Sequence, residues 1–247
     1  MYDSEIKKST DTQKEIKSVA EYLKVVSSIS KKDSVVLYRG HAGDNWELTP
    51  AVGRRYNGER KLLKYEEAIF LDFKRQYHLY ADDRPATDMD ILFLAQHHEL
   101  PTRLLDWTYN PLIALLFACQ EATENTVDGH RKLDGYVFYI AQKKQKDFLK
   151  EGHKLDNDIF GKNIKTKTEH YFIVPDYTNR RFLNQKGMFI WFKNPDVEFK
   201  DYTDKILIKE ENKKNILQEL VALGVTKAFV LPTLDNLCYD IKTQYAI

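Results

Sequence analysis

Cysteine is scarce in this sequence, with two residues in 247, and the two lie far apart at Cys119 and Cys238. Such a pair forms neither a disulfide framework nor a zinc-binding motif. Cys119 falls in the apolar run 115–119, which indicates a buried and inert thiol. The cysteine content therefore favours a reducing compartment, and we expect a cytoplasmic protein.

An excess of charge of either sign is also missing. Thirty-eight basic residues face 37 acidic ones, for a formal net charge of +1. The net charge is too small to attract nucleic acid or an anionic membrane to the protein as a whole. A local basic patch is still compatible with this composition. The longest apolar run falls well short of the ~20 residues that span a membrane. Residues 1–5 are polar and show no signal-peptide core, so no membrane partner is expected.

Several catalytic signatures are absent. There is no Gly-x-Gly-x-x-Gly, no P-loop, no Gly-x-Ser-x-Gly and no Cys–His nucleophile pattern. A Rossmann dehydrogenase, a P-loop kinase and a serine hydrolase are therefore disfavoured. His97 and His98 are adjacent, and neighbouring residues of a helix point about 100° apart, so they rarely share a metal. We expect no metal site.

What the sequence does contain is enough apolar material for a sizeable core, at 43% hydrophobic and 13% aromatic residues. No linker divides it, so we expect a single domain over 1–247. Residues 1–17 are expected to be an N-terminal extension and 151–170 a loop insertion. Helical and strand patterns are mixed without regular βαβ alternation. This predicts an α+β fold with helices packed on mixed or antiparallel sheets.

Capping signals mark three helix starts, at Ser18 with Glu21, at Thr87, and at Asn110 with Pro111. We expect helices over 18–31, 62–80, 91–98, 142–150, 179–184 and 211–223, one after Asn110, and a last one over 234–241. We expect strands over 35–38, 136–140, 171–174, 187–192 and 205–208.

The first group of candidate site residues is Tyr38-Arg39-Gly40-His41. An arginine at the end of a strand presents a rigid fork of donors that suits phosphate or carboxylate. The following glycine lets a ligand approach the backbone. The alternative is an arginine that simply pairs with an internal carboxylate.

The densest polar stretch runs from Gln96 to Asn110, directly before an apolar helix pattern. Gln96 and Thr102 are uncharged groups that can recognise an amide or a ribose. Thr108 precedes the cap of the next helix, where anions bind. The indole of Trp107 can either stack on a base or fill the core. Arg103 and Asp106 are three residues apart and can pair on one face, either at a ligand site or in a structural network.

A third group follows residue 179, where two arginines precede Gln185 and Gly187. A glutamine beside a strand that opens with glycine can orient a sugar hydroxyl. The alternative is a basic surface turn before a core strand.

Taken together, these motifs resemble the FRG domain, a family named for a Phe/Tyr-Arg-Gly motif. The resemblance runs from about residue 18 to the C-terminus. The family occurs largely in bacteria and phages and is associated with defence or toxin contexts. The residues that carry the resemblance are Tyr38-Arg39-Gly40, Trp46-x-Leu48-x-Pro50, Arg54, Gln96-His97, Pro101 to Thr108, Asn110-Pro111, Ala114-Leu115, Phe117-Ala118, Asn179-Arg180 and Gln185-x-Gly187-x-Phe189.

The motif order of this family is similar to that of ADP-ribosyltransferases, which implies a split sheet. Carried over by position, the resemblance implies Arg39, Thr108 and Gln185 as catalytic residues. The third position differs, because many transferases have glutamate there, and the second segment lacks a Ser-Thr-Ser triplet. The residues expected to bind the cofactor are Tyr38, Gly40, Gln96, His97, Thr102, Arg103, Asp106, Trp107 and Tyr109.

The first functional hypothesis is therefore an NAD-consuming enzyme, either an ADP-ribosyltransferase or an NAD glycohydrolase, with NAD as the substrate. The acceptor stays open among protein, nucleic acid, small molecule and water, and a regulatory partner protein is possible. The second hypothesis is a non-catalytic module that binds a nucleotide or nucleic acid through phosphate contacts and stacking. A structural or partner-binding role is the third.

Overall fold

The computed structural model describes residues 14–30, 35–54, 62–80, 85–127, 129–142, 155, 158–163, 169–175 and 186–245. The helix expected at 179–184 and the catalytic candidate Gln185 lie outside these residues. The helix expected at 142–150 does so as well, apart from Gln142, which ends a strand.

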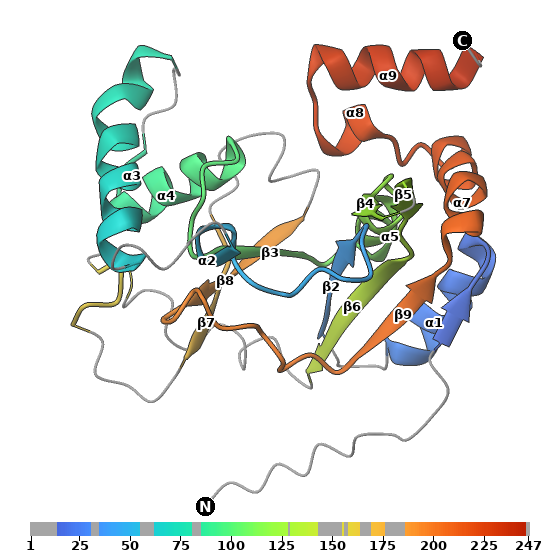
Figure 1. Cartoon of the computed structure of the whole chain (residues 1–247), viewed down its shortest axis with the longest axis horizontal. Helices are drawn as coiled ribbons and strands as arrows, with labels where there is room; N and C mark the ends of the chain where they lie inside the picture. The colour runs from blue at the N-terminus through green and yellow to red at the C-terminus, as the bar shows by residue number, and fades with distance from the viewer. Residues whose placement is uncertain are drawn as a thin grey trace, which may run out of the picture.

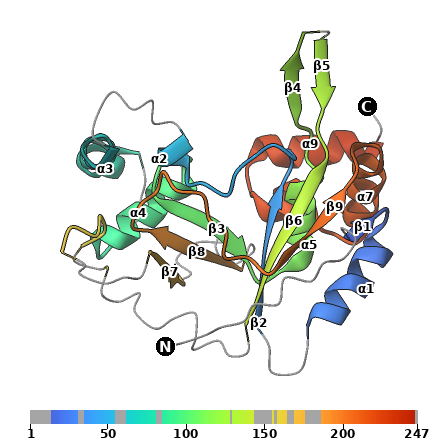
Figure 2. The same cartoon turned by 60° about the horizontal axis from the view of Figure 1, so that its bottom comes forward.

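A seven-stranded mixed sheet organises the molecule (Figure 1). Its neighbouring strands are antiparallel except β1 and β9, which run parallel. The strands in spatial order are β1 (Lys14–Ile16), β9 (Asp204–Ile208), β6 (Gly135–Gln142), β2 (Val35–His41), β3 (Leu104–Thr108), β8 (Gly187–Phe192) and β7 (His170–Ile173). A separate hairpin of β4 (Thr123–Thr126) and β5 (Gly129–Lys132) projects from the body of the fold (Figure 2).

Helices cover the two halves of the sheet separately, which confirms the α+β class. One half, β1-β9-β6-β2, packs its apolar side chains against α1 (Val19–Ile29), α5 (Pro111–Ala118) and α7 (Glu210–Ala222). The other half, β3-β8-β7, packs against α3 (Leu62–Gln76) and α4 (Asp88–His97). The remaining helical elements are α2 (Ala51–Arg54), the 3-10 turn η1 (Tyr77–Leu79), α8 (Lys227–Val230) and α9 (Leu234–Tyr245).

The two halves are joined by one residue pair. Tyr38 of β2 pairs with Thr108 of β3, after which the strands diverge. By contrast, β2 pairs with β6 along its whole length, and β3 pairs likewise with β8. The sheet is thus nearly split between β2 and β3. A third apolar cluster, around Trp107 and Phe199, packs on the face of the sheet opposite the helices named above.

Local capping chemistry starts the helices where the sequence predicts. Ser18 accepts the backbone N–H of Glu21, and Thr87 forms a reciprocal capping box with Asp90. Asn110 caps α5 through the N–H of Leu112, with Pro111 at the first helical position.

Two expected boundaries look different in the structure. Within the expected N-terminal extension, residues 14–16 form the edge strand β1. Within the expected loop insertion, Leu155 and Ile159 are buried in the cluster below α3 and α4. Both segments therefore contribute to the packed fold. In the described part of the chain, no helix combines the length and the apolar character that crossing a membrane requires.

Candidate functional site

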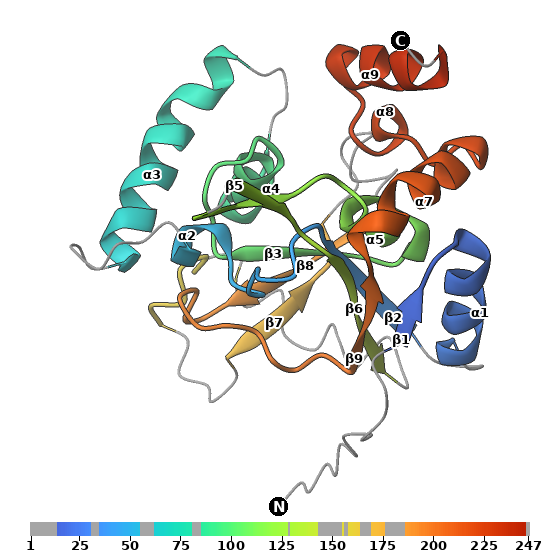
Figure 3. The ribbon, with the colours of Figure 1, turned by 45° about the vertical axis from the view of Figure 1, so that its right-hand side comes forward.

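A cavity of about 350 Å³ opens where β2 and β3 diverge. Its walls come from the end of α4, from α2 and from α5, which lies against β2 (Figure 3). A cavity of this size is within the range of small-molecule sites. The residues that line it are Tyr38, Arg39, Gly40, Ala51, Arg54, Gln96, Glu99, Leu100, Asp106, Trp107, Thr108, Ile113, Ala114 and Phe117.

Two of the three predicted catalytic positions therefore meet in one cavity, namely Arg39 and Thr108. The chain enters the described part again at Lys186, one residue after Gln185, and Gly187 pairs with Thr108. Of the predicted cofactor-binding residues, the cavity walls include Tyr38, Gly40, Gln96, Asp106 and Trp107.

The Arg39 side chain crosses the gap between the separated strands. Its Nη1 donates to the backbone carbonyl of Asp106 at 2.6 Å and lies 3.8 Å from the Oδ2 of the same residue. Its Nε donates to Nε2 of His41 at 3.0 Å. These contacts fix the guanidinium, and its Nη2 has no hydrogen-bond partner within the described residues. Arg39 can thus offer a preoriented donor to a ligand.

The electrostatics around Arg39 favour an anion. Burial lowers the pKa of the Arg39 guanidinium to about 10, Asp106 opposes this shift, and Arg54 adds to it. Burial also lowers the pKa of His41 well below its usual value, with a further contribution from the charge of Arg39. His41 is therefore neutral at neutral pH and accepts a hydrogen bond. Two guanidinium groups near one cavity repel each other, and a bound phosphate would relieve that repulsion.

A chain of side-chain hydrogen bonds holds the Asp106 carboxylate in place. Thr102 donates to Oε1 of Gln96 at 2.5 Å, and Nε2 of Gln96 donates to Oδ2 of Asp106 at 2.9 Å. Thr102 is buried, whereas 53% of the Asp106 side chain is exposed. Gln96 therefore orients the Asp106 carboxylate, while about half of the Asp106 side chain stays accessible to a ligand. Thr102 acts through Gln96 and does not line the cavity itself.

Gly40 has a packing role that the sequence analysis did not predict. A Cβ at this position would lie 2.0 Å from the carbonyl oxygen of Ala114 and 2.7 Å from the backbone nitrogen of Ala118. Because Gly40 has no side chain, helix α5 can pack directly against β2. The group that comes close to the Gly40 backbone is thus a helix and not a ligand.

Thr108 and Trp107 contribute to the wall of the cavity in different ways. The Thr108 hydroxyl accepts the backbone N–H of Asn110 at 2.9 Å, so it belongs to the turn that starts α5. The Trp107 ring is 2% exposed and meets Phe199 edge-on with centroids 5.9 Å apart. The indole therefore fills the core, which was one of the two alternatives for this residue.

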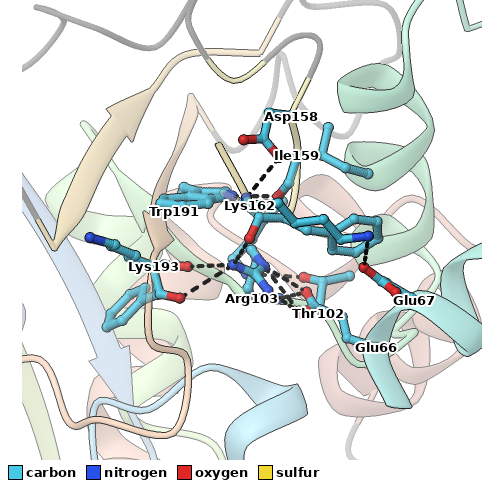
Figure 4. A network of polar contacts seen from close by, with 12 residues as sticks. Glu66, Glu67, Thr102, Arg103, Asp158, Ile159, Lys162, Trp191 and Lys193 are labelled. Carbon is cyan, nitrogen blue, oxygen red and sulfur yellow. Dashed lines mark hydrogen bonds and ion pairs between the residues drawn. The ribbon is translucent and has the colours of Figure 1, made fainter. Parts of the chain in front are cut away.

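Arg103 lies in a buried ion pair (Figure 4). It does not line the cavity. Its Nε donates to both Glu66 carboxylate oxygens at 2.9 and 3.0 Å, and its Nη2 donates to Oε2 at 2.5 Å. Its Nη1 donates to the carbonyls of Phe160 and Phe192. Arg103 does not pair with Asp106, an arrangement that the sequence left open, because residues 104–108 form a strand and the three-residue helical spacing does not apply.

His97 and Tyr109, two further cofactor-binding candidates, do not line the cavity. His97 is at the end of α4, and its ring contacts the ring of His98 at 4.8 Å. The backbone N–H of Tyr109 donates to the carbonyl of Lys186, so this residue joins the start of α5 to the start of β8. Within the described residues, no group of three His, Cys, Asp or Glu side chains is arranged to hold a metal ion.

Three further groups in the cavity wall were not among the predicted site residues. Arg54 ends the short helix α2, and its only signal was its place in the family motif. Glu99 has a φ of 63°, a left-handed conformation that is uncommon outside glycine and often marks functional sites. The inner face of α5 contributes Ile113, Ala114 and Phe117, which look like ordinary core residues in the sequence.

A comparison with protein-family models finds a match in the N-terminal part of the chain. Residues 34–126 fit a family model described as the FRG domain. All the residues that line the cavity fall inside this range, whereas Gln185 lies outside it. No curated protein and no solved structure matches the chain.

Proposed function

We propose that the cavity, whose lining residues all lie in the part of the chain that fits the FRG domain model, binds and cleaves a dinucleotide of the NAD class. The observation that carries the proposal is the convergence of two arginines and an oriented carboxylate on one cavity at the split of the sheet. NAD has a negative pyrophosphate and a positive pyridinium ring. A site that contains both basic and acidic side chains can complement both charges.

Arg39 and Arg54 are the groups that would bind the pyrophosphate. The guanidinium of Arg39 is already held by His41 and by the Asp106 carbonyl, so little side-chain entropy is lost when a phosphate binds. Gln96 and Thr108 would contact the nicotinamide amide and its ribose.

The Asp106 carboxylate would act on the reacting bond. When the bond between C1′ and the nicotinamide nitrogen breaks, its electron pair goes to that nitrogen and neutralises the ring. Positive charge then develops on the ribose, and a carboxylate fixed beforehand by Gln96 stabilises it. Water or another nucleophile attacks C1′ and loses a proton. The products are nicotinamide and either ADP-ribose or an ADP-ribosylated acceptor. Gln185 would position the ribose or the acceptor.

The test is nicotinamide release from NAD by the full chain, measured by chromatography and mass spectrometry. We expect Asp106→Asn to lower the rate by about 10²–10³ while NAD binding stays within a few fold, because the carboxylate acts mainly on the transition state. We expect Arg39→Ala to weaken binding of both NAD and ADP-ribose. Arg75→Ala is the matched control, since Arg75 is exposed on α3 and away from the cavity.

Each negative result has a definite meaning. Tight binding of NAD without turnover, with any acceptor supplied, would replace the enzyme by a nucleotide-binding module. If neither NAD nor ADP-ribose binds, the proposal fails altogether. Affinity for nucleic acid that falls steeply with salt would instead support a nucleic-acid module.

A further inference from the structure

Helix α9 is oriented with its polar side toward the body of the protein. The Asp240 carboxylate accepts the backbone N–H groups of Lys227 and Ala228 at 3.2 and 2.7 Å, which caps α8. Nδ2 of Asn236 donates to the carbonyl of Leu231 at 2.8 Å. Hydrogen bonds from polar side chains therefore contribute to holding α9 against α8.

The apolar side of α9 points the opposite way. Its stripe has the spacing i, i+3, i+4, i+7 and i+11, and at 100° per residue it lies roughly across the helix from Asn236 and Asp240. Every member of the stripe is exposed, and the exposed fraction of its leucine, isoleucine and tyrosine residues runs from 46% at Ile241 to 75% at Leu234. The stripe consists of Leu234, Leu237, Cys238, Ile241 and Tyr245. In Figures 1 and 3, α9 lies at the periphery, beyond α8.

An amphipathic helix normally buries its apolar stripe, and an uncovered stripe of this kind marks a contact surface. The polar residues of α9 do not suit a membrane surface, because Lys242 is its only basic side chain beside Asp235 and Asp240. A protein partner is therefore favoured.

The charges that flank the stripe identify the partner as a second copy of the chain. Asp235 and Lys242 are exposed, lie on the same flank two turns apart, and have no ion-pair partner within the described residues. In an antiparallel pair related by a two-fold axis, the same flanks of both helices meet. Asp235 of each copy then faces Lys242 of the other, so the opposite charges match twice. In a parallel pair the two charged flanks would lie on opposite sides of the interface, so Asp235 of one copy would not meet Lys242 of the other.

We propose that α9 is an interface through which two copies of this protein associate as an antiparallel helix pair. The axis passes midway between residues 235 and 242, next to Cys238. The two Cys238 thiols then lie about 1.5 Å apart along the helix direction. This proposal depends on α9 alone and stands independently of the cavity.

The first experiment measures the mass of the full chain in solution as a function of concentration, by analytical ultracentrifugation. We expect a dimer, and we expect Ile241→Glu to give a monomer whose melting temperature equals that of the original protein at dilutions where it is monomeric, because the side chain lies on the outer side of a folded helix. Leu79→Glu is the matched control, since Leu79 is also exposed but belongs to η1. It should leave the dimer intact.

The second experiment tests the antiparallel arrangement. Asp235→Lys and Lys242→Asp should each weaken self-association, by about tenfold if both symmetric pairs become repulsive. A mixture of these two variants should associate as well as the original protein, because their charges are then complementary. The double variant should also recover. A short bis-maleimide should join two chains through Cys238, and Cys238→Ser should abolish the product.

Cys119 does not interfere, because it is buried and burial raises the pKa of its thiol to about 12. A monomer at every concentration would overturn the proposal, as would a dimer that Ile241→Glu leaves unchanged. Failure of the mixed charge variants to associate would overturn the antiparallel arrangement. Sedimentation of the monomer with lipid vesicles would assign the stripe to a membrane surface instead.

Discussion

At the level of single residues, Arg103 is a charged side chain buried in the interior. It is 2% exposed, its partner Glu66 is 1% exposed, and its guanidinium also lies over the Trp191 ring at 5.2 Å. A charge that leaves water needs its partner, because a buried unpaired charge is far less stable than an exposed one. The pair therefore connects α3 to the strand β3, and through it to the wall of the cavity.

We predict that Glu66→Gln lowers the free energy of unfolding by about 3–5 kcal/mol, since it leaves the Arg103 charge buried without compensation. Urea denaturation measures the change. The neighbouring Glu67→Gln is the control, because Glu67 pairs with the half-exposed Lys162 at the surface, where such pairs contribute about 0–1 kcal/mol. Equal effects of the two substitutions would contradict the structural role given to Arg103.

His41, which accepts a hydrogen bond from Arg39 of the cavity wall, makes the stability of the fold depend on pH. Its folded-state pKa is depressed by burial and by Arg39, so the unfolded chain binds a proton more readily than the folded one below pH 6.5. The stability that neutral His41 provides is thus present above the unfolded pKa and is lost as pH falls through and below it. Burial lowers the pKa of His170 as well, and this acts in the same direction.

We predict that the free energy of unfolding decreases from neutral pH to about 5.5, by at most about 1.4 kcal/mol per pH unit for each histidine. His41→Asn should flatten part of this slope, whereas the same change at the exposed His130 should not. Denaturation at several pH values measures the slope, and NMR titration of the imidazoles measures the pKa values directly. A His41 resonance that titrates near 6.5 would refute the assignment.

At the level of elements, helix α5 packs closely against strand β2. A methyl group at Gly40 has no room between the strand and the backbone of α5. We predict that Gly40→Ala destabilises the protein by about 1–3 kcal/mol and distorts the cavity, because the helix must move outward. Thermal melting and NAD binding report the two effects.

Gly187→Ala is the matched control for that substitution. A Cβ at Gly187 would meet nothing within 4 Å, and the residue is also at the end of a strand beside the cavity. The free energy of unfolding of the Gly187→Ala variant should stay the same or rise by up to about 1 kcal/mol. If both variants lose a comparable amount of stability, any side chain at this end of the sheet would be destabilising. The loss at Gly40 would then not be due to a specific clash with α5.

The helices of this fold were more predictable than its strands. Ser18, Thr87 and Asn110 cap α1, α4 and α5 because capping involves residues only two or three positions apart. Strand β3 was missed, since its polar neighbours resemble a loop. Strand β1 was missed as well, because three residues pair only when β9, some 190 positions later, lies beside them.

For the molecule as a whole, the split between β2 and β3 makes the cavity. If the two strands paired along their full length, the space next to Arg39 and Asp106 would be filled by backbone hydrogen bonds. Instead, the Arg39 side chain reaches the Asp106 carbonyl across the gap. The pair Tyr38 and Thr108 marks where the sheet begins to open, and the motif residues 38–40 and 106–108 flank that point.

Much of the candidate site was predictable from residue types, and its internal organisation was not. Arg39 was selected because an arginine at a strand end before a glycine suits an anion, and Gln96, Asp106 and Thr108 because dense polar groups next to an apolar pattern indicate a pocket. That Arg103 binds Glu66 could not be derived, because the two residues are 37 positions apart and either arginine could have turned toward Asp106.

The sequence by itself determined the α+β class, the starts of three helices and the resemblance to the FRG domain, because these depend on nearby residues and on motif order. Only the tertiary structure decided which arginine faces the cavity, why Gly40 is a glycine and which side of α9 is exposed. Those outcomes depend on contacts between segments distant in the chain, where packing and desolvation select one partner among several that are chemically equivalent.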